Sequence, residues 1–150
     1  MKLETEQLFI IPCTDEAVSL LTEQNYDNGP QVWGHLKKLE EDPSILYWGP
    51  WLALLKSDST VIGDLGFKGK PDDKSSVEIG YGLLEEYWRK GYATEAVAAL
   101  MEWAWKQDEV RKIKAETLRD NPGSIRVLEK LGMTVVIKSD EMIYWEKNKA

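Results

Sequence analysis

Two residue types that define many functional sites are scarce in this sequence. Its 150 residues include one cysteine, Cys13, and one histidine, His35. A single cysteine excludes an intrachain disulfide, and a thiol nucleophile would need a histidine–carboxylate set that the chain lacks, so Cys13 is expected to be a small core residue. With no second histidine, no metal site is expected. No apolar run approaches the roughly 20 residues that cross a bilayer.

Positive charge is also scarce. Lys and Arg number 19 against 26 Asp and Glu, which gives a net charge of -7 and a pI of about 4.8. Nucleic acid is therefore excluded as a main partner, because phosphate contacts need a basic face. The N-terminus carries no apolar signal core, so we expect a cytoplasmic protein without a membrane partner. No repeat or linker interrupts the chain, and residues 1–150 are predicted to form a single domain.

Alternating apolar residues and turn-forming residues predict a chain rich in strands. The expected strands are 3–11, 51–55, 60–67, 76–83, 112–118, 133–137 and 142–145. Turn residues at 57–59 and 71–76 separate the strands 51–55, 60–67 and 76–83. We therefore expect these three strands to be neighbours that run antiparallel. A further turn is predicted over 25–30.

The apolar period changes to that of a helix after Gly91. Apolar residues recur at helical spacing from Ala93 to Ala104, which predicts a helix over 92–107. This helix joins two predicted strands, 76–83 and 112–118. We therefore expect those strands to be parallel neighbours in a mixed α/β sheet, connected by a right-handed crossover.

Three other helices are predicted from capping and breaking residues. Thr14 or Asp15 can cap a short helix, and a polar helix over 31–41 contains His35, which is expected to be exposed. Asn121 can cap a third helix with Pro122 in its first position. The prediction is thus about four helices in all.

The segment from Glu78 to Ala96 has the pattern of a strand, a short loop and a helix start. A helix N-terminus exposes unpaired backbone N–H groups and the positive end of the helix dipole. Gly91 allows the backbone to approach a ligand closely, and Arg89 and Lys90 add positive charge. Together these features favour a pyrophosphate site. The pattern alone also fits a loop in which the glycine only permits a turn.

Two segments resemble motifs of the GNAT superfamily of N-acetyltransferases. Trp88-Arg-Lys-Gly-Tyr-Ala93 is similar to its acetyl-coenzyme A motif, Gln/Arg-x-x-Gly-x-Gly/Ala, with Trp in the first position. Asn121-Pro-Gly-Ser-Ile-Arg-Val-Leu-Glu-Lys-Leu-Gly-Met133 is similar to its Asn-x-x-Ser/Ala, helix, Gly-Phe signature. The opening Leu3-Glu-Thr-Glu-Gln-Leu8 resembles the subgroup that acetylates ribosomal-protein N-termini, the Rim-type enzymes. The resemblance covers nearly the whole chain.

The resemblance implies the GNAT fold, a mixed and mostly antiparallel sheet in which two parallel strands splay apart. The pantetheine arm of the cosubstrate acetyl-coenzyme A would enter between strands 77–83 and 112–118 and pair with backbone like an added strand. The implied cofactor-binding residues are Tyr81, Gly82, Leu83, Arg89, Lys90, Gly91, Tyr92, Ala93, Thr94 and Asn121.

The implied activity is acetyl transfer to a primary amine by direct attack on the thioester. A carboxylate can take the amine proton, directly or through water. Glu116 matches the base of some N-terminal acetyltransferases, and Glu78 lies in the Glu-Ile-Gly-Tyr motif of the subgroup. Strand alternation places Glu78 and Tyr81 on opposite faces but leaves open which face meets the acceptor. Each glutamate also fits a solvated strand residue.

The proton donor to the departing thiolate is the least defined role. Many family members have a tyrosine where this chain has Leu128. Ser124 matches a serine proposed to act in the Rim-type subgroup, and it equally fits helix capping beside Asn121. Water is a third donor. Leu128 also supports an alternative function, a non-catalytic acyl-coenzyme A-binding or sensor domain on the same fold.

The resemblance also suggests the partners. The acceptor would be a small-molecule amine or a protein N-terminal amine, and homodimers are common in the family. Trp33, Trp48 and Trp51 lie near the part of the chain where acceptor specificity varies, and they are expected to border the acceptor pocket.

Overall fold

The computed structural model describes residues 1–24 and 30–149, so part of the turn predicted over 25–30 lies outside the described residues. The elements are β1 (Leu3–Glu4), β2 (Leu8–Pro12), α1 (Asp15–Gln24), α2 (Pro30–Glu41), a 3-10 helix η1 (Pro43–Trp48), β3 (Pro50–Leu55), β4 (Val61–Phe67), β5 (Ser76–Leu83), a 3-10 helix η2 (Glu85–Tyr87), α3 (Tyr92–Trp105), β6 (Lys112–Leu118), α4 (Pro122–Lys130), β7 (Thr134–Lys138) and β8 (Met142–Asn148).

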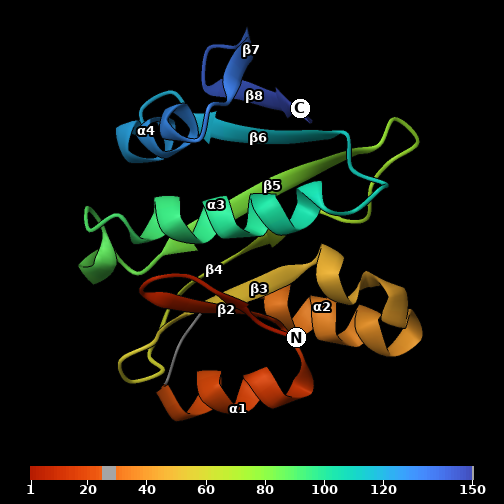
Figure 1. Ribbon diagram of the computed structural model, residues 1–150, viewed down its shortest axis with the longest axis vertical. Helices are drawn as coiled ribbons and strands as arrows, with labels where there is room; N and C mark the ends of the chain where they lie inside the picture. The colour runs from red at the N-terminus through yellow and green to blue at the C-terminus, as the bar shows by residue number, and fades with distance from the viewer. Residues whose placement is uncertain (25–29, 150) are drawn as a thin grey trace.

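The strands form one sheet of eight with the order β1-β2-β3-β4-β5-β6-β8-β7 (Figure 1). In it β5 and β6 run parallel, while the other strand pairs described are antiparallel. Helix α3 connects the parallel pair, because parallel neighbours need a crossover. The predicted mixed α/β sheet and its crossover helix are therefore confirmed.

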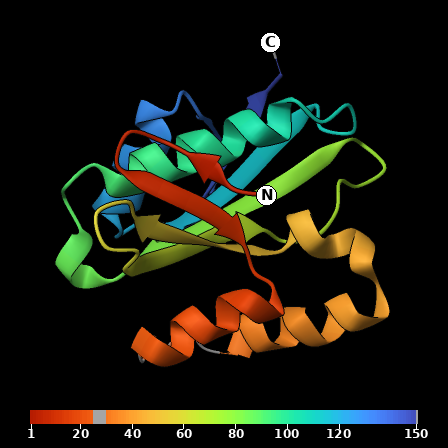
Figure 2. The same cartoon turned by 60° about the horizontal axis from the view of Figure 1, so that its bottom comes forward.

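Helices cover the two faces of the sheet unequally (Figure 2). Helix α3 packs on one face through Val97, Leu100 and Met101, which join a core that extends from β2 to β8. Helices α1 and α2 cover the opposite face only at its N-terminal strands, where residues such as Leu52 and Val61 are buried beneath them. The opposite face of β5 and β6 therefore has no helix packed on it among the described residues.

Aromatic residues fill the core beneath the end of α3. The ring of Trp103 lies 5.1 Å from Trp48, 5.3 Å from Trp51 and 5.9 Å from Phe67, measured between centroids. Trp48 and Trp51 are buried. They stabilise the contact of α3 with β3, so the expectation that they border an acceptor pocket is wrong. The side chain of Trp33 lies outside the described part of the structure.

Two local expectations are corrected. His35 is 7% exposed, because its ring lies where a side chain at position 49 would be, and Gly49 leaves that space free. Burial, followed by the charge of Lys38, lowers the pKa of His35. The strand predicted over 3–11 is two antiparallel strands, since Thr5 turns the chain by donating its N–H to the carbonyl of Leu8 at 2.9 Å.

Candidate acyl-coenzyme A site

The site lies where β5 and β6 separate. The two strands pair at Ser76↔Lys112, Val77↔Ile113 and Glu78↔Lys114, and β5 then continues to Leu83 without pairing to β6. The predicted splay is therefore present. Among the described residues, no strand pairs with the β6-facing edge of β5 beyond Glu78, while the opposite edge is bonded to β4.

The backbone of β5 can bind an extended ligand at this free edge. The backbone carbonyl of Glu78 points toward β4, where it accepts a hydrogen bond from the backbone N–H of Lys68 at 2.9 Å. Backbone groups alternate sides along a strand, so Tyr81 and Leu83 direct their N–H and C=O groups toward the gap. These are two of the three residues predicted to pair with the pantetheine arm.

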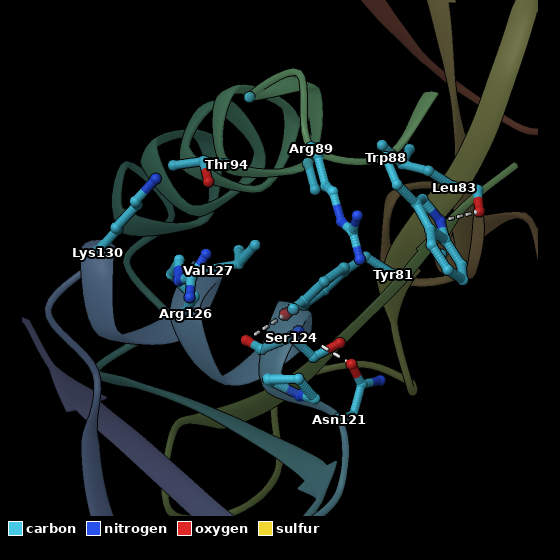
Figure 3. Close-up of a pocket in the computed structure, with 15 residues that line it drawn as sticks. Tyr81, Leu83, Trp88, Arg89, Thr94, Asn121, Ser124, Arg126, Val127 and Lys130 are labelled. Carbon is cyan, nitrogen blue, oxygen red and sulfur yellow. Dashed lines mark hydrogen bonds between the residues drawn. The ribbon is translucent and has the colours of Figure 1, made fainter. Parts of the chain in front are cut away.

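A cavity of about 730 Å³ opens at the gap, a volume typical of ligand sites (Figure 3). Its walls come from β5, the following loop, the first turn of α3, and α4. The lining residues are Tyr81, Gly82, Leu83, Trp88, Arg89, Gly91, Ala93, Thr94, Asn121, Pro122, Gly123, Ser124, Arg126, Val127 and Lys130. Eight of the ten predicted cofactor-binding residues are in this set, and Lys90 and Tyr92 are not.

The N-terminus of α3 has no side-chain cap among the described residues. Gly91 occupies the N-cap position with φ of 84°, a left-handed conformation that suits glycine. Arg89 also has positive φ, 64°, which a non-glycine residue adopts at some energetic cost. The first-turn N–H groups of Ala93 and Thr94 have no acceptor within the helix. This helix end can therefore bind an anion.

Every charged side chain that lines the cavity is basic, although the chain as a whole is acidic. Arg89 comes from the loop, and Arg126 and Lys130 come from α4. The sequence-based prediction missed these two α4 residues, together with Val127. Helical spacing contained the signal: Gly123, Arg126, Val127 and Lys130 recur at i, i+3, i+4 and i+7, on the side of α4 away from the buried Leu128.

The two excluded residues pack outside the cavity. Tyr92 lies against Tyr87 with 6.4 Å between ring centroids, and the ammonium group of Lys90 lies 5.9 Å from the Tyr87 ring. Trp88, which replaces the first polar residue of the motif, donates its indole N–H to the carbonyl of Leu83 at 2.8 Å. One backbone acceptor at the gap is therefore already occupied by a side chain that is 55% exposed.

Asn121 begins α4 and also faces the cavity. Its Oδ1 accepts the N–H of Ser124 at 3.1 Å, as an N-cap residue does. The Nδ2 donor is not used by this cap. Both interpretations made from the sequence, capping and contact with the cofactor arm, can therefore hold for the same side chain.

The two candidate bases lie on the sheet face opposite α3. Val77, Ile79, Ile113 and Ala115 are buried in the core beneath α3, so strand alternation directs Glu78 and Glu116 to the other face. The structure thus shows on which face each glutamate lies. The ammonium group of Lys68 joins the two carboxylates, at 2.5 Å from Glu78 Oε2 and 3.2 Å from Glu116 Oε1.

Each glutamate has 32% of its side chain exposed, and Glu116 counts as an exposed residue, so both carboxylates contact Lys68 and solvent. Burial acts to lower the pKa of Lys68, but hydrogen bonds and charges from both carboxylates outweigh it and raise that pKa. The cluster therefore holds a protonated primary amine beside the point where β5 and β6 part.

Helix α3 is attached to the N-terminal hairpin through Glu95. Its carboxylate accepts the backbone N–H of Gln7 at 2.9 Å, the Gln7 side-chain amide at 2.9 Å, and the hydroxyl of Thr5. These bonds hold the N-terminal end of α3 in place without using the N–H groups of that helix.

Two negative findings apply to the described residues. No group of three histidine, cysteine, aspartate or glutamate side chains in this part of the chain could hold a metal ion. None of the helices within the described ranges is long and apolar enough to cross a membrane.

A parallel pair that splays beside an uncapped helix end places the structure in the class of acyl-coenzyme A-dependent acetyltransferases implied by the motifs. The family pattern described as acetyltransferase (GNAT) domain matches residues 8–134, and the chain belongs to this family. The family activity is acetyl-coenzyme A-dependent acetylation of amines.

Relatives and solved structures agree with this assignment. The uncharacterized N-acetyltransferase YjdG of Bacillus subtilis is 38% identical over 95 residues, covering 63% of this chain and 56% of the relative. The uncharacterized N-acetyltransferase p20 of Bacillus licheniformis is 33% identical over 78 residues, covering 52% and 44%. The matched region thus spans about half the length of these relatives.

The structural neighbours include ribosomal-protein acetyltransferases. The ribosomal-protein-S5-alanine acetyltransferase of Vibrio fischeri superposes with a TM-score of 0.81 at 20% identity, covering 99% of this chain and 97% of that one. RimL, a ribosomal L7/L12 α-N-protein acetyltransferase in complex with coenzyme A, superposes with a TM-score of 0.78 at 15% identity, covering 99% and 98%. At these identities the likeness establishes the fold.

Proposed function

We propose that the protein transfers an acetyl group from acetyl-coenzyme A to a primary amine by direct attack of the amine on the thioester. The observation that carries this proposal is that the uncapped N-terminus of α3 and the edge of β5 that β6 leaves unpaired line the same cavity. The helix N-terminus suits a diphosphate, and the strand edge suits an extended arm that contains amides. Coenzyme A contains both groups in one molecule.

The residues present fit this cosubstrate. Amides of the α3 first turn and the guanidinium of Arg89 would bind the pyrophosphate. Tyr81 would pair with the pantetheine arm through its backbone, and Asn121 would donate its Nδ2 from the other side. Arg126 and Lys130 would add charge complementarity to further phosphate oxygens. The thioester would then lie where β5 and β6 begin to part.

The face opposite the cavity suits an amine acceptor. Glu78 and Glu116 already hold the primary ammonium group of Lys68, so their chemistry matches that of a protonated acceptor. An amine attacks only when neutral, and a carboxylate can take its proton directly or through water. Glu116 follows the last paired residues of β5 and β6 and borders the gap, which favours it over Glu78 as the base.

The acceptor would be a small-molecule amine or the α-amine of a protein. Two solved neighbours support the second class: RimL by its description as an α-N-protein acetyltransferase, and a Salmonella typhimurium enzyme described as modifying the N-terminal serine of ribosomal protein L7/L12. The open face of β5 and β6 leaves room for a chain end as well as for a small amine.

The proposal is tested by coenzyme A release with acetyl-coenzyme A and a panel of amines: peptides with N-terminal serine or alanine, spermidine and lysine. We expect turnover with at least one of them. Glu116→Gln should lower kcat/KM about 100-fold, and most at low pH where fewer amines are neutral. Glu78→Gln is the matched comparison on the same cluster. Unchanged rates and pH profiles in both variants would show that neither Glu116 nor Glu78 is the base.

Leu128 favours a second candidate, a non-catalytic acyl-coenzyme A-binding domain. The residue is fully buried and offers no proton at the position where many family members have tyrosine. Tight binding of acetyl-coenzyme A in calorimetry with no turnover on any amine of the panel would support this function and contradict acetyl transfer.

A further inference from the structure

The proposed reaction leaves one proton unassigned. As the amine forms its bond to the acetyl carbon, the carbon–sulfur bond breaks and the electron pair remains on sulfur. Coenzyme A then leaves as a thiol after the sulfur takes up a proton. Leu128 cannot supply it, so the donor is either water or another residue at the cavity.

Three residues with hydroxyl groups line the cavity: Tyr81, Thr94 and Ser124. Thr94 belongs to the first turn of α3, which is the anion-binding end. Tyr81 and Ser124 lie together at the other end, where the Tyr81 hydroxyl donates to the backbone carbonyl of Ser124 at 3.1 Å (Figure 3). Tyr81 follows the last β5–β6 pair by three residues, so its ring borders the gap that the arm would enter.

Acidity distinguishes the two hydroxyls at that end. A phenol has a pKa of about 10, close to the value of about 8.5 for a free thiol, whereas a serine hydroxyl does not titrate in the range of protein groups. A general acid is most effective when its pKa lies near the operating pH, and a phenol is much nearer to it than an aliphatic alcohol. The phenol of Tyr81 is therefore a better proton donor to a thiolate than the alcohol of Ser124.

The environment of Tyr81 keeps its hydroxyl protonated. Burial raises the pKa of Tyr81 and the bond to Ser124 lowers it, with burial dominant, so the group stays protonated at neutral pH. The carbonyl of Ser124 lies in α4, where the N–H of Leu128 is its helical partner. The hydroxyl can therefore turn from this carbonyl to a sulfur without leaving a buried acceptor unpaired.

We propose that Tyr81 is a catalytic residue, the acid that gives its hydroxyl proton to the sulfur of coenzyme A as the thioester bond breaks. The tyrosinate then regains a proton from water, which balances the proton that the amine loses to the carboxylate cluster. The assignment rests on the proposed acetyl transfer. It gives the hydroxyl of Ser124 no proton-transfer role.

The first test compares Tyr81→Phe with Ser124→Ala in the amine assay. Tyr81→Phe should lower kcat about 100-fold, while the dissociation constant for coenzyme A, measured by calorimetry, stays unchanged and reports an intact site. Ser124→Ala should lower kcat by a much smaller factor than Tyr81→Phe. Tyr87→Phe, at a tyrosine that packs on Tyr92 outside the cavity, should keep kcat near that of the original chain. A normal kcat for Tyr81→Phe, or a larger loss for Ser124→Ala, would overturn the assignment.

The second test needs no acceptor. Coenzyme A labelled with ¹³C next to sulfur is bound to the protein, and its thiol is titrated by NMR. A donating Tyr81 stabilises the thiolate, so Tyr81→Phe should raise the pKa of the bound thiol by about one pH unit, and Ser124→Ala should not. Equal thiol pKa values in all three proteins contradict the proposal. If Tyr81→Phe raises the thiol pKa but the original chain acetylates no amine of the panel, acetyl transfer is refuted. The contact between Tyr81 and the sulfur then still stands.

Discussion

Two helix N-termini meet at the same cavity, and they are built in opposite ways. Helix α4 begins at Asn121, whose side chain accepts the N–H of Ser124, with Pro122 in the first position. Helix α3 begins at Gly91, which has no side chain and a left-handed backbone, and no side chain of the described chain caps it. The α4 end satisfies part of its own hydrogen-bonding capacity, whereas the α3 end leaves that capacity to a ligand.

The difference shows how a fold can keep a binding site open. An uncapped helix end is less stable, because its first N–H groups lack partners. In α3, the compensating bonds come from Glu95, which accepts from Thr5 and Gln7 and so attaches the helix to the N-terminal hairpin. Stability of this helix end thus comes from contacts with another element, and its N–H groups remain available.

The largest expected effect comes from placing a negative charge at the uncapped N-terminus of α3. Gly91→Asp and Gly91→Asn are matched in size, and both residues tolerate left-handed backbone better than most. Gly91→Asp should weaken acetyl-coenzyme A binding about 100-fold or more, because a carboxylate would lie close to the pyrophosphate. Gly91→Asn should lose much less affinity for acetyl-coenzyme A, because its side chain carries no charge. Equal affinities of the two variants in calorimetry would show that no diphosphate binds at this turn.

At the capped end, substitutions can separate stability from binding. Asn121→Ala removes the cap and should lower the free energy of unfolding by about 1 kcal/mol, whereas Asn121→Ser retains a capping oxygen and most of that stability. Both variants lack the Nδ2 donor, so both should bind coenzyme A about fivefold more weakly. Thermal melts and calorimetry on the pair check this. Normal affinity in Asn121→Ser would restrict Asn121 to capping.

The smallest expected effect concerns the attachment of α3. Glu95→Gln should lower the free energy of unfolding by about 0.5 kcal/mol, with the exposed Glu102→Gln in the same helix as control. Burial acts to raise the pKa of Glu95, but hydrogen bonds from Thr5 and Gln7 outweigh it and lower that pKa.

A lowered pKa in the folded state gives Glu95 a pH-dependent contribution. It is present above the ordinary range of glutamate and is lost as the pH falls through the lowered pKa. The stability difference between the original chain and Glu95→Gln should therefore shrink on acidification. A difference that stays constant down to acid pH would argue that the carboxylate charge plays no part in the attachment.

Much of the site could be predicted from the sequence because its signals are local. Glycine at 91 and the Asn121-Pro122 pair mark helix starts through backbone chemistry within a few residues, and both predictions match the helices observed. The missed features depend on distant contacts. His35 looked like a residue on a polar helix, and only the missing side chain of Gly49 explains its burial.

The sequence by itself determined most of the order of strands and helices, the helix start after Gly91 and the capped start at Asn121, since these follow from periodicity and local backbone preferences. Only the tertiary structure decided that Lys68 joins Glu78 and Glu116 on one face, and that the hydroxyl of Tyr81 reaches Ser124 on the other. The physical reason is that strand register and helix packing bring together side chains that are 10 to 48 residues apart.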